Sequence, residues 1–159
     1  MFEPYKSEAE RQTATYGGFT LKSFRLPHDG TANCGAYIIC PDGHRMLYMT
    51  DYEYCGFTFA KQRINTMLIE CNYCKSMIDP EEGKYSHVLR GHASLDVAQE
   101  FVRVNSTADL RTVILCHLSA TSADEAEIMR GITGVVDPDV DVTIARRGVT
   151  LELTDWRDL

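Results

Sequence analysis

R-M-L-Y-M-T-D, residues 45–51, is a short apolar run that ends in an acidic residue, Asp51. Short apolar runs that are bounded by polar or turn residues are typical of buried β-strands. Three further runs have this form: F-R-L-P-H ends at His28, T-M-L-I-E at Glu70 and T-V-I-L-C-H at His117. Because ligands of open α/β sheets bind outside the carboxyl ends of the strands, these four polar ends are candidates for one shared rim.

Each of the four residues also has a plainer interpretation. A single histidine or aspartate at the end of a strand often caps a loop or simply meets solvent, so one such residue carries no functional argument. Four strand ends of the same kind in one chain favour a common site over four separate loop residues.

Apolar runs and turn residues also predict the remaining strands. We expect strands over residues 19–26, 36–40, 45–50, 66–70 and 111–117, with the turn P-D-G at 41–43 between the second and the third. A closing hairpin is predicted from residues 142–145 and 149–153. His44, next to the turn, is expected to be exposed and to have no partner.

Capping residues and apolar spacing predict two helices. Ser94 is a good N-cap for a helix whose apolar face is Leu95, Val97, Ala98, Phe101 and Val102. Ser122 and Glu125 form a capping box for a helix over residues 123–130. Residues 7–15 predict a weaker helix. His92 then lies just before a helix N-terminus, where backbone N–H groups favour anions such as phosphate, although an ordinary helix entry looks the same.

Five stretches of the sequence, taken together, resemble a known family. They are F-R-L-P-H-D-G-T-A-N-C-G-A-Y-I (24–38), L-Y-M-T-D (47–51), L-I-E-C-N-Y (68–73), R-G-H-A-S (90–94) and V-I-L-C-H-L-S (113–119). In their order and spacing, across residues 18 to 153, the chain resembles the C-terminal half of a metallo-β-lactamase-fold hydrolase. It looks closest to the branch of ribonuclease Z and related phosphodiesterase-like hydrolases.

The resemblance implies a fold class. Members of the family pack two similar halves as an αββα sandwich, so this chain is expected to be α/β, with a mixed sheet flanked by helices. The order strand, helix, strand, helix, strand fits one such layer pair. Since we find no repeat, low-complexity segment or linker, we expect residues 1–159 to form a single, partial domain of this fold.

The resemblance also implies a role for each candidate residue. In the family two zinc ions, sometimes manganese or iron, lie between the two halves. His28 matches a ligand of one metal, Asp51 the carboxylate that bridges both, and His117 a ligand of the other. His92 matches a histidine that donates a proton near the scissile phosphate, and Glu70 an acidic residue that supports it. The implied activity is metal-dependent hydrolysis of phosphodiester bonds.

The main metal-binding motif of the family, H-x-H-x-D-H, is absent, and no two of the five histidines are two residues apart. Three ligands cannot hold two zinc ions, and a di-metal hydrolase needs both ions in place. Two histidines and a carboxylate can still hold one divalent ion with open positions. We therefore expect zinc, manganese or iron at partial occupancy in the isolated chain, or no metal at all.

Length suggests a partner. The complete family fold needs roughly 200–250 residues as one unit, and this chain has 159. The sheet face that packs against the other half would then be exposed, and large apolar patches mark interfaces. Either a separately encoded N-terminal half or a second copy of the chain is expected to cover it.

Three functional hypotheses follow from these observations. The first is a hydrolase that acts when it is complete or partnered, which the five collinear matches favour. The second is a non-catalytic homodimeric binding module, which the missing motif favours. The third is an unrelated α/β domain in which the same residues are structural. An H-x-H-x-D-H sequence encoded just upstream in the DNA would distinguish the first two.

Charge and composition limit the partners. A net charge of −7 and a pI near 5.2 argue against broad electrostatic binding of nucleic acid. A metal site can offset this locally, so a nucleic-acid or nucleotide substrate stays open. An apolar run long enough for a membrane span is missing and the N-terminus is polar, which predicts a cytoplasmic protein.

Six cysteines are then expected to be reduced thiols. Cys71 and Cys74 form a C-x-x-C pair, which is found in redox couples and in half of a structural zinc site. Because such zinc sites need a second pair at a suitable distance, the plainer interpretation is two partly buried thiols.

Overall fold

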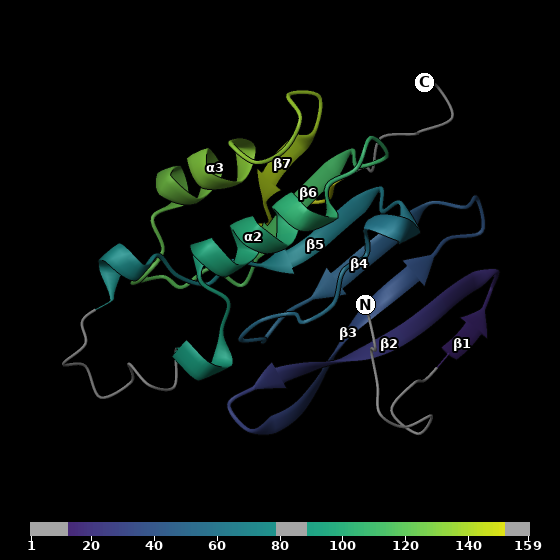
Figure 1. Cartoon of the computed structure of the whole chain (residues 1–159), viewed down its shortest axis with the longest axis horizontal. Helices are drawn as coiled ribbons and strands as arrows, with labels where there is room; N and C mark the ends of the chain where they lie inside the picture. Colours follow the sequence, from purple (N-terminus) through teal and green to yellow (C-terminus); the bar gives the residue numbers. More distant parts are fainter. Residues whose placement is uncertain (1–12, 79–88, 152–159) are drawn as a thin grey trace.

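The computed structural model describes residues 13–78 and 89–151. Seven strands in these residues form one sheet, and they lie side by side in the order in which they occur in the sequence (Figure 1). Their bounds are β1 Thr13–Tyr16, β2 Phe19–His28, β3 Thr31–Ile39, β4 Arg45–Met49, β5 Thr66–Glu70, β6 Thr112–Cys116 and β7 Asp141–Ile144.

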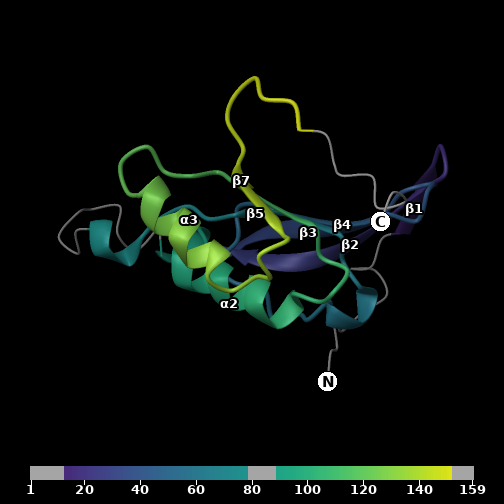
Figure 2. The ribbon, with the colours of Figure 1, turned by 90° about the horizontal axis from the view of Figure 1, so that it is seen from above.

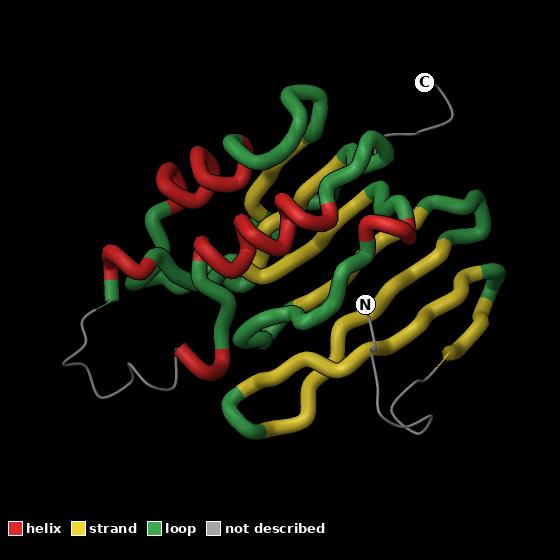
Figure 3. The backbone as a smooth tube through the Cα atoms, viewed as in Figure 1, coloured by secondary structure: helices red, strands yellow, loops and turns green. Residues whose placement is uncertain are grey.

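The sheet is mixed. Strands β1 to β4 pair antiparallel, whereas β4 to β7 pair parallel. Parallel neighbours need crossovers, and Figure 3 shows helical segments in each of them. They include the short 3-10 helices η2 Ala60–Gln62 and η3 Lys75–Met77, and the α-helices α2 Leu95–Asn105 and α3 Glu125–Thr133. The carboxyl ends of β4, β5 and β6 consequently share one edge of the sheet.

The core lies between the sheet and helices α2 and α3. Alternate residues of the central strands point to the helices and are fully buried, among them Leu47 and Met49 on β4 and Met67 and Ile69 on β5. The helices contribute apolar faces, with Phe101 of α2 almost fully buried. Full burial of such a side chain contributes about 1.5–3 kcal/mol. The α/β fold class expected from the sequence, a mixed sheet with helices, is confirmed.

The other face of the sheet carries the intervening residues of the same strands. Both α2 and α3 lie on the core side, so neither of them covers this second face (Figure 2). Leu21 and Tyr48, which alternate with core residues, are 38% and 40% exposed. A one-sided sheet of this kind leaves apolar surface available to another layer.

Among residues 13–78 and 89–151, no helix is both long enough and apolar enough to cross a membrane.

Several strand boundaries differ from the sequence prediction. Strand β2 extends two residues further, to His28, and β3 begins at Thr31, because the two strands pair along their whole length as a tight hairpin. Strands β4, β5 and β6 lie within the predicted ranges.

The predicted N-terminal helix and C-terminal hairpin are wrong where the structure describes them. Thr13, Ala14 and Thr15 form β1, which pairs with β2, and residues 7–12 lie outside the described part. Residues 145–151 contain no strand, and β7 pairs in parallel with β6. Residues 152–153 of the hairpin lie outside the described residues. In the first place, pairing with the next strand in a tight hairpin overrides the weak helical pattern, and in the second β7 pairs with β6 instead of with residues 149–151.

Helix α3 begins two residues later than predicted. Its N-cap is Asp124, whose carboxylate accepts a hydrogen bond from the Glu127 backbone N–H at 2.9 Å. Ser122 instead donates its backbone N–H to Ser119 Oγ at 3.1 Å. The helix also continues to Thr133, beyond the predicted end at residue 130.

His44 is buried, contrary to the prediction that it is exposed and unpartnered. It is 6% exposed, and its Nε2 forms a hydrogen bond of 3.0 Å with Thr66 Oγ1 at the start of β5. Burial lowers the pKa of His44, with the charge of Asp42 acting weakly in the other direction. The turn at residues 41–43 therefore folds its following histidine inward, which a pattern of turn residues cannot indicate.

The free energy of unfolding should depend on His44 in mildly acidic solution. Because the pKa of His44 is lower in the folded state, the unfolded chain binds its proton more tightly, and stability falls as the pH drops below the unfolded value of about 6.5. Urea unfolding at pH 7.5 and 5.5 should show a larger loss for the wild type than for His44→Gln. Equal losses in the two proteins would contradict this role.

Candidate metal centre

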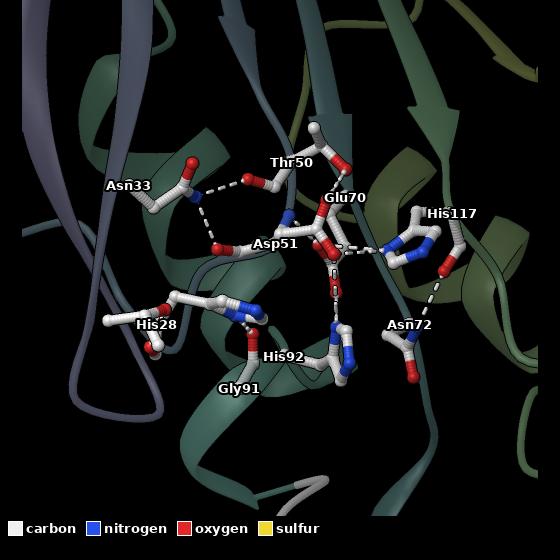
Figure 4. Close-up of polar contacts among 10 residues, drawn as sticks. His28, Asn33, Thr50, Asp51, Glu70, Asn72, Gly91, His92 and His117 are labelled. Carbon is white, nitrogen blue, oxygen red and sulfur yellow. Dashed lines mark hydrogen bonds and ion pairs between the residues drawn. The ribbon is translucent and has the colours of Figure 1, made fainter.

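Three strand ends bring metal-capable side chains to one edge of the sheet. Asp51 lies two residues after β4, Glu70 is the last residue of β5, and His117 follows β6 directly. His92 joins them from the segment before α2. One ligand atom from each of the four residues lies within 4.8 Å of the others (Figure 4).

Glu70 is the centre of this cluster. Its side chain is fully buried, and its Oε1 lies 2.8 Å from His92 Nδ1 while its Oε2 lies 3.3 Å from His117 Nδ1. Oε2 also accepts a hydrogen bond from the backbone N–H of Asp51. A buried carboxylate is costly unless it is paired and hydrogen-bonded, and these three contacts meet that requirement.

Asp51 and His117 are the open side of the cluster. Their side chains are 41% and 44% exposed, and Asp51 Oδ1 lies 3.6 Å from His117 Nδ1. Both residues have left-handed backbone conformations, with φ of 54° and 55°. For residues other than glycine this conformation costs roughly 1–2 kcal/mol, so the surrounding structure must hold both residues in place.

His28, the fourth strand-end residue of the sequence pattern, lies beside the cluster. Its ring centroid is 5.6 Å from that of His92, and its Nδ1 lies 2.6 Å from the carbonyl oxygen of Gly91. A carbonyl only accepts, so Nδ1 carries the proton and Nε2 of a neutral ring keeps its lone pair. Gly91 permits this approach, because a Cβ there would lie 3.3 Å from His28 Cε1.

The structure thus assembles a different set from the one the resemblance implied. Asp51 and His117 were expected as metal ligands and lie in the cluster. Glu70 and His92, expected as a supporting acid and a proton donor, lie in the same cluster. His28, expected as a ligand, is not among the four. The roles of all five residues stay predictions.

The cluster can hold a metal ion by the chemistry of its donors. Two imidazoles and two carboxylates suit zinc, manganese and iron, and carboxylates that contact a histidine are a common support for metal-bound imidazole. Asp51, Glu70, His92 and His117 can therefore act as metal ligands, and Glu70 can also orient the two histidines that it contacts.

Two thiols, Cys71 and Cys116, are neighbours of the cluster in the sequence. Burial raises the pKa of each to about 12; Cys74 and then Glu70 act in the same direction on Cys71, and Glu70 does so on Cys116. All six cysteines are free. In residues 13–78 and 89–151, the group of metal-capable residues contains no cysteine, so the C-x-x-C pair of Cys71 and Cys74 has no metal site around it there.

The fold can be compared with that of proteins of known structure. It is similar to the crystal structure of unliganded yeast PDE1, a phosphodiesterase, with a TM-score of 0.58 and 14% sequence identity. The similarity covers 87% of this chain and 47% of PDE1, so the chain spans about half the length of that protein.

At this identity the similarity shows the fold alone. The mixed sheet with its helices is consistent with half of a metallo-β-lactamase-like sandwich, as expected from the sequence. No protein family matches the sequence, and no curated protein matches it either.

Proposed function

We propose that this chain is part of a metal-dependent hydrolase of phosphodiester bonds. One observation carries the proposal: two carboxylates and two histidines lie within 4.8 Å of one another at the strand ends of a metallohydrolase-like fold. A nucleotide or nucleic acid is the substrate class that fits a phosphodiesterase-like fold.

Asp51 and His117 are the ligands we assign to a divalent cation. They are the two exposed members of the cluster, so a cation can reach them from solvent. His28 would complete the set through its Nε2, since its Nδ1 is occupied by Gly91. The bound cation would polarise the phosphoryl oxygen and lower the pKa of a bound water.

His92 and Glu70 form the proton-donating pair in this proposal. Glu70 accepts a hydrogen bond from His92 Nδ1–H at 2.8 Å, which orients the ring and favours its doubly protonated form. From that form, Nε2–H would pass its proton to the leaving oxygen of the substrate and leave His92 as a neutral ring protonated at Nδ1. If all four residues of the cluster instead bind one cation, His92 is a ligand and donates no proton.

A second candidate is a non-catalytic homodimeric module. The absence of H-x-H-x-D-H and the sheet face that α2 and α3 leave uncovered favour it. In either case we propose that another layer packs on this face, supplied by a second copy of the chain or by a separately encoded N-terminal half. In the catalytic case the added layer would also supply the remaining metal ligands.

Native mass spectrometry with and without zinc tests both candidates, because it reports metal content and assembly together. The hydrolase proposal expects a zinc-bound species, and hydrolysis of bis(4-nitrophenyl) phosphate by the assembled protein that stops when EDTA is added. A metal-free dimer that zinc does not change would mean that the chain is a non-catalytic module, or that the missing half is required before hydrolysis can occur.

A further inference from the structure

The two exposed residues of the cluster share a backbone feature. Asp51 and His117 each follow a parallel strand, and each turns out of it in the left-handed region, with φ of 54° and 55°. Side chains other than glycine rarely adopt this region, although aspartate and histidine do so several times more often than most residues. The bend still carries a conformational cost at both positions, which other groups must offset.

Asn33 holds the bend at Asp51. This residue lies on β3, and its amide Nδ2 donates to the carbonyl oxygens of both Thr50, at 2.8 Å, and Asp51 (Figure 4). The two N–H groups of one amide thus bind the two successive carbonyls that enter and leave the bend. Asn33 has no contact of this kind with the carboxylate itself, so its action on the Asp51 side chain passes through the backbone.

Asn72 holds the bend at His117 in the same way. It is 8% exposed, and its Nδ2 donates to the carbonyl oxygen of His117 at 2.7 Å. The backbone N–H of Asn72 donates to the Ala93 carbonyl, and the backbone carbonyl of Asn72 accepts from the Ser119 N–H, both at 2.8 Å. Asn72 therefore ties the segment that follows His92 to the loop that carries His117.

We propose that Asn33 and Asn72 are positioning residues of the cation site, which hold Asp51 and His117 in place before a cation binds. This inference rests on the proposed function. A site whose ligands are already ordered loses less conformational freedom when the ion arrives, so it binds more tightly. Outer groups that orient metal ligands typically change metal affinity by about 10- to 100-fold.

The experiment compares zinc binding by Asn33→Ala and Asn72→Ala with the wild type, by isothermal titration calorimetry. Alanine removes the side-chain amide and keeps the backbone hydrogen bonds that Asn72 makes to Ala93 and Ser119. Each substitution should raise the Kd for zinc by about 10- to 100-fold. The absorption spectrum of bound cobalt should also change, since it reports the arrangement of ligands around the ion.

Asn65→Ala is the matched control. The side chain of Asn65 also bonds only to backbone groups, accepting from Arg45 N–H at 2.9 Å and donating to the Asp109 carbonyl at 3.1 Å, but it lies at the start of β5, away from the site. This variant should lower the melting temperature while the Kd for zinc and the cobalt spectrum stay unchanged. Wild-type zinc affinity in both Asn33→Ala and Asn72→Ala would overturn the inference.

A cation-free measurement separates this inference from the proposed function. If the wild type binds no zinc, the metal site itself fails. The backbone NMR shifts of Asp51 and His117 still test the positioning role, because they report the left-handed conformation without any ion. Shifts that move in the two variants but not in Asn65→Ala support that role, and shifts that stay unchanged in all three variants refute it.

Discussion

Asp51→Gly is expected to remove cation binding and cation-dependent hydrolysis while leaving the fold intact. Glycine adopts a φ of 54° without strain, so the substitution deletes the carboxylate and preserves the bend after β4. Loss of a direct ligand should weaken zinc binding by more than the roughly 10- to 100-fold that an outer group contributes. Calorimetry with zinc and a phosphodiester assay on the same sample measure both effects.

Asp29→Gly is the control for this substitution. Asp29 also follows a strand, has a φ of 40° and lies one residue from His28, but it is not among the four clustered residues. Its carboxylate lies 3.6 Å from the Arg90 guanidinium. Zinc affinity should therefore survive in this variant. Unchanged turnover in Asp51→Gly would show that Asp51 is not a ligand of a catalytic cation.

Gly35→Ala should give the largest loss of stability. Gly35 pairs with Phe24 across β2 and β3, and a Cβ at this position would lie 2.5 Å from Phe24 Cζ and 3.1 Å from Met49 Cγ. The Phe24 ring cannot easily yield, since Phe57 and Phe59 pack against it at centroid distances of 5.9 and 4.9 Å. Overpacking of this kind costs about 1–3 kcal/mol. Urea unfolding measures the difference in the free energy of unfolding.

Gly56→Ala provides the comparison for Gly35. A Cβ at Gly56 would meet no atom within 4 Å, and the residue does not have a positive φ. An alanine there should leave stability unchanged or raise it by about 0.4–1 kcal/mol through the entropy of the unfolded chain. If Gly35→Ala is as stable as Gly56→Ala, the Phe24 ring can shift to make room for the added methyl group, and the predicted overpacking is wrong.

Local patterns were sufficient for the short central strands. The runs that end at Asp51, Glu70 and His117 could be recognised because each is a short, largely apolar stretch that ends in a polar residue. Since parallel strands point the same way, their ends had to share one edge of the sheet. The helix after Ser94 was predictable for a similar reason, because its cap and its apolar spacing lie within one continuous segment.

Local patterns failed where the partner of a segment decided the outcome. Residues 13–15 pair with the neighbouring β2 instead of forming a helix, and His44 turns inward to contact Thr66 at the start of β5. Asn33 and Asn72 lie in two of the stretches that resemble the family, but the sequence assigns neither of them a role, since that role depends on the carbonyls they contact.

The sequence by itself determined the α/β class, the central strands and the end of the sheet at which chemistry is expected, because hydrophobic periodicity and strand direction are local properties of the chain. Only the tertiary structure decided that Glu70 and His92 join Asp51 and His117, that His28 lies beside them, and that two asparagines hold the bends. These relations depend on distances between residues that are tens of positions apart, and such distances are set by packing rather than by neighbouring residues.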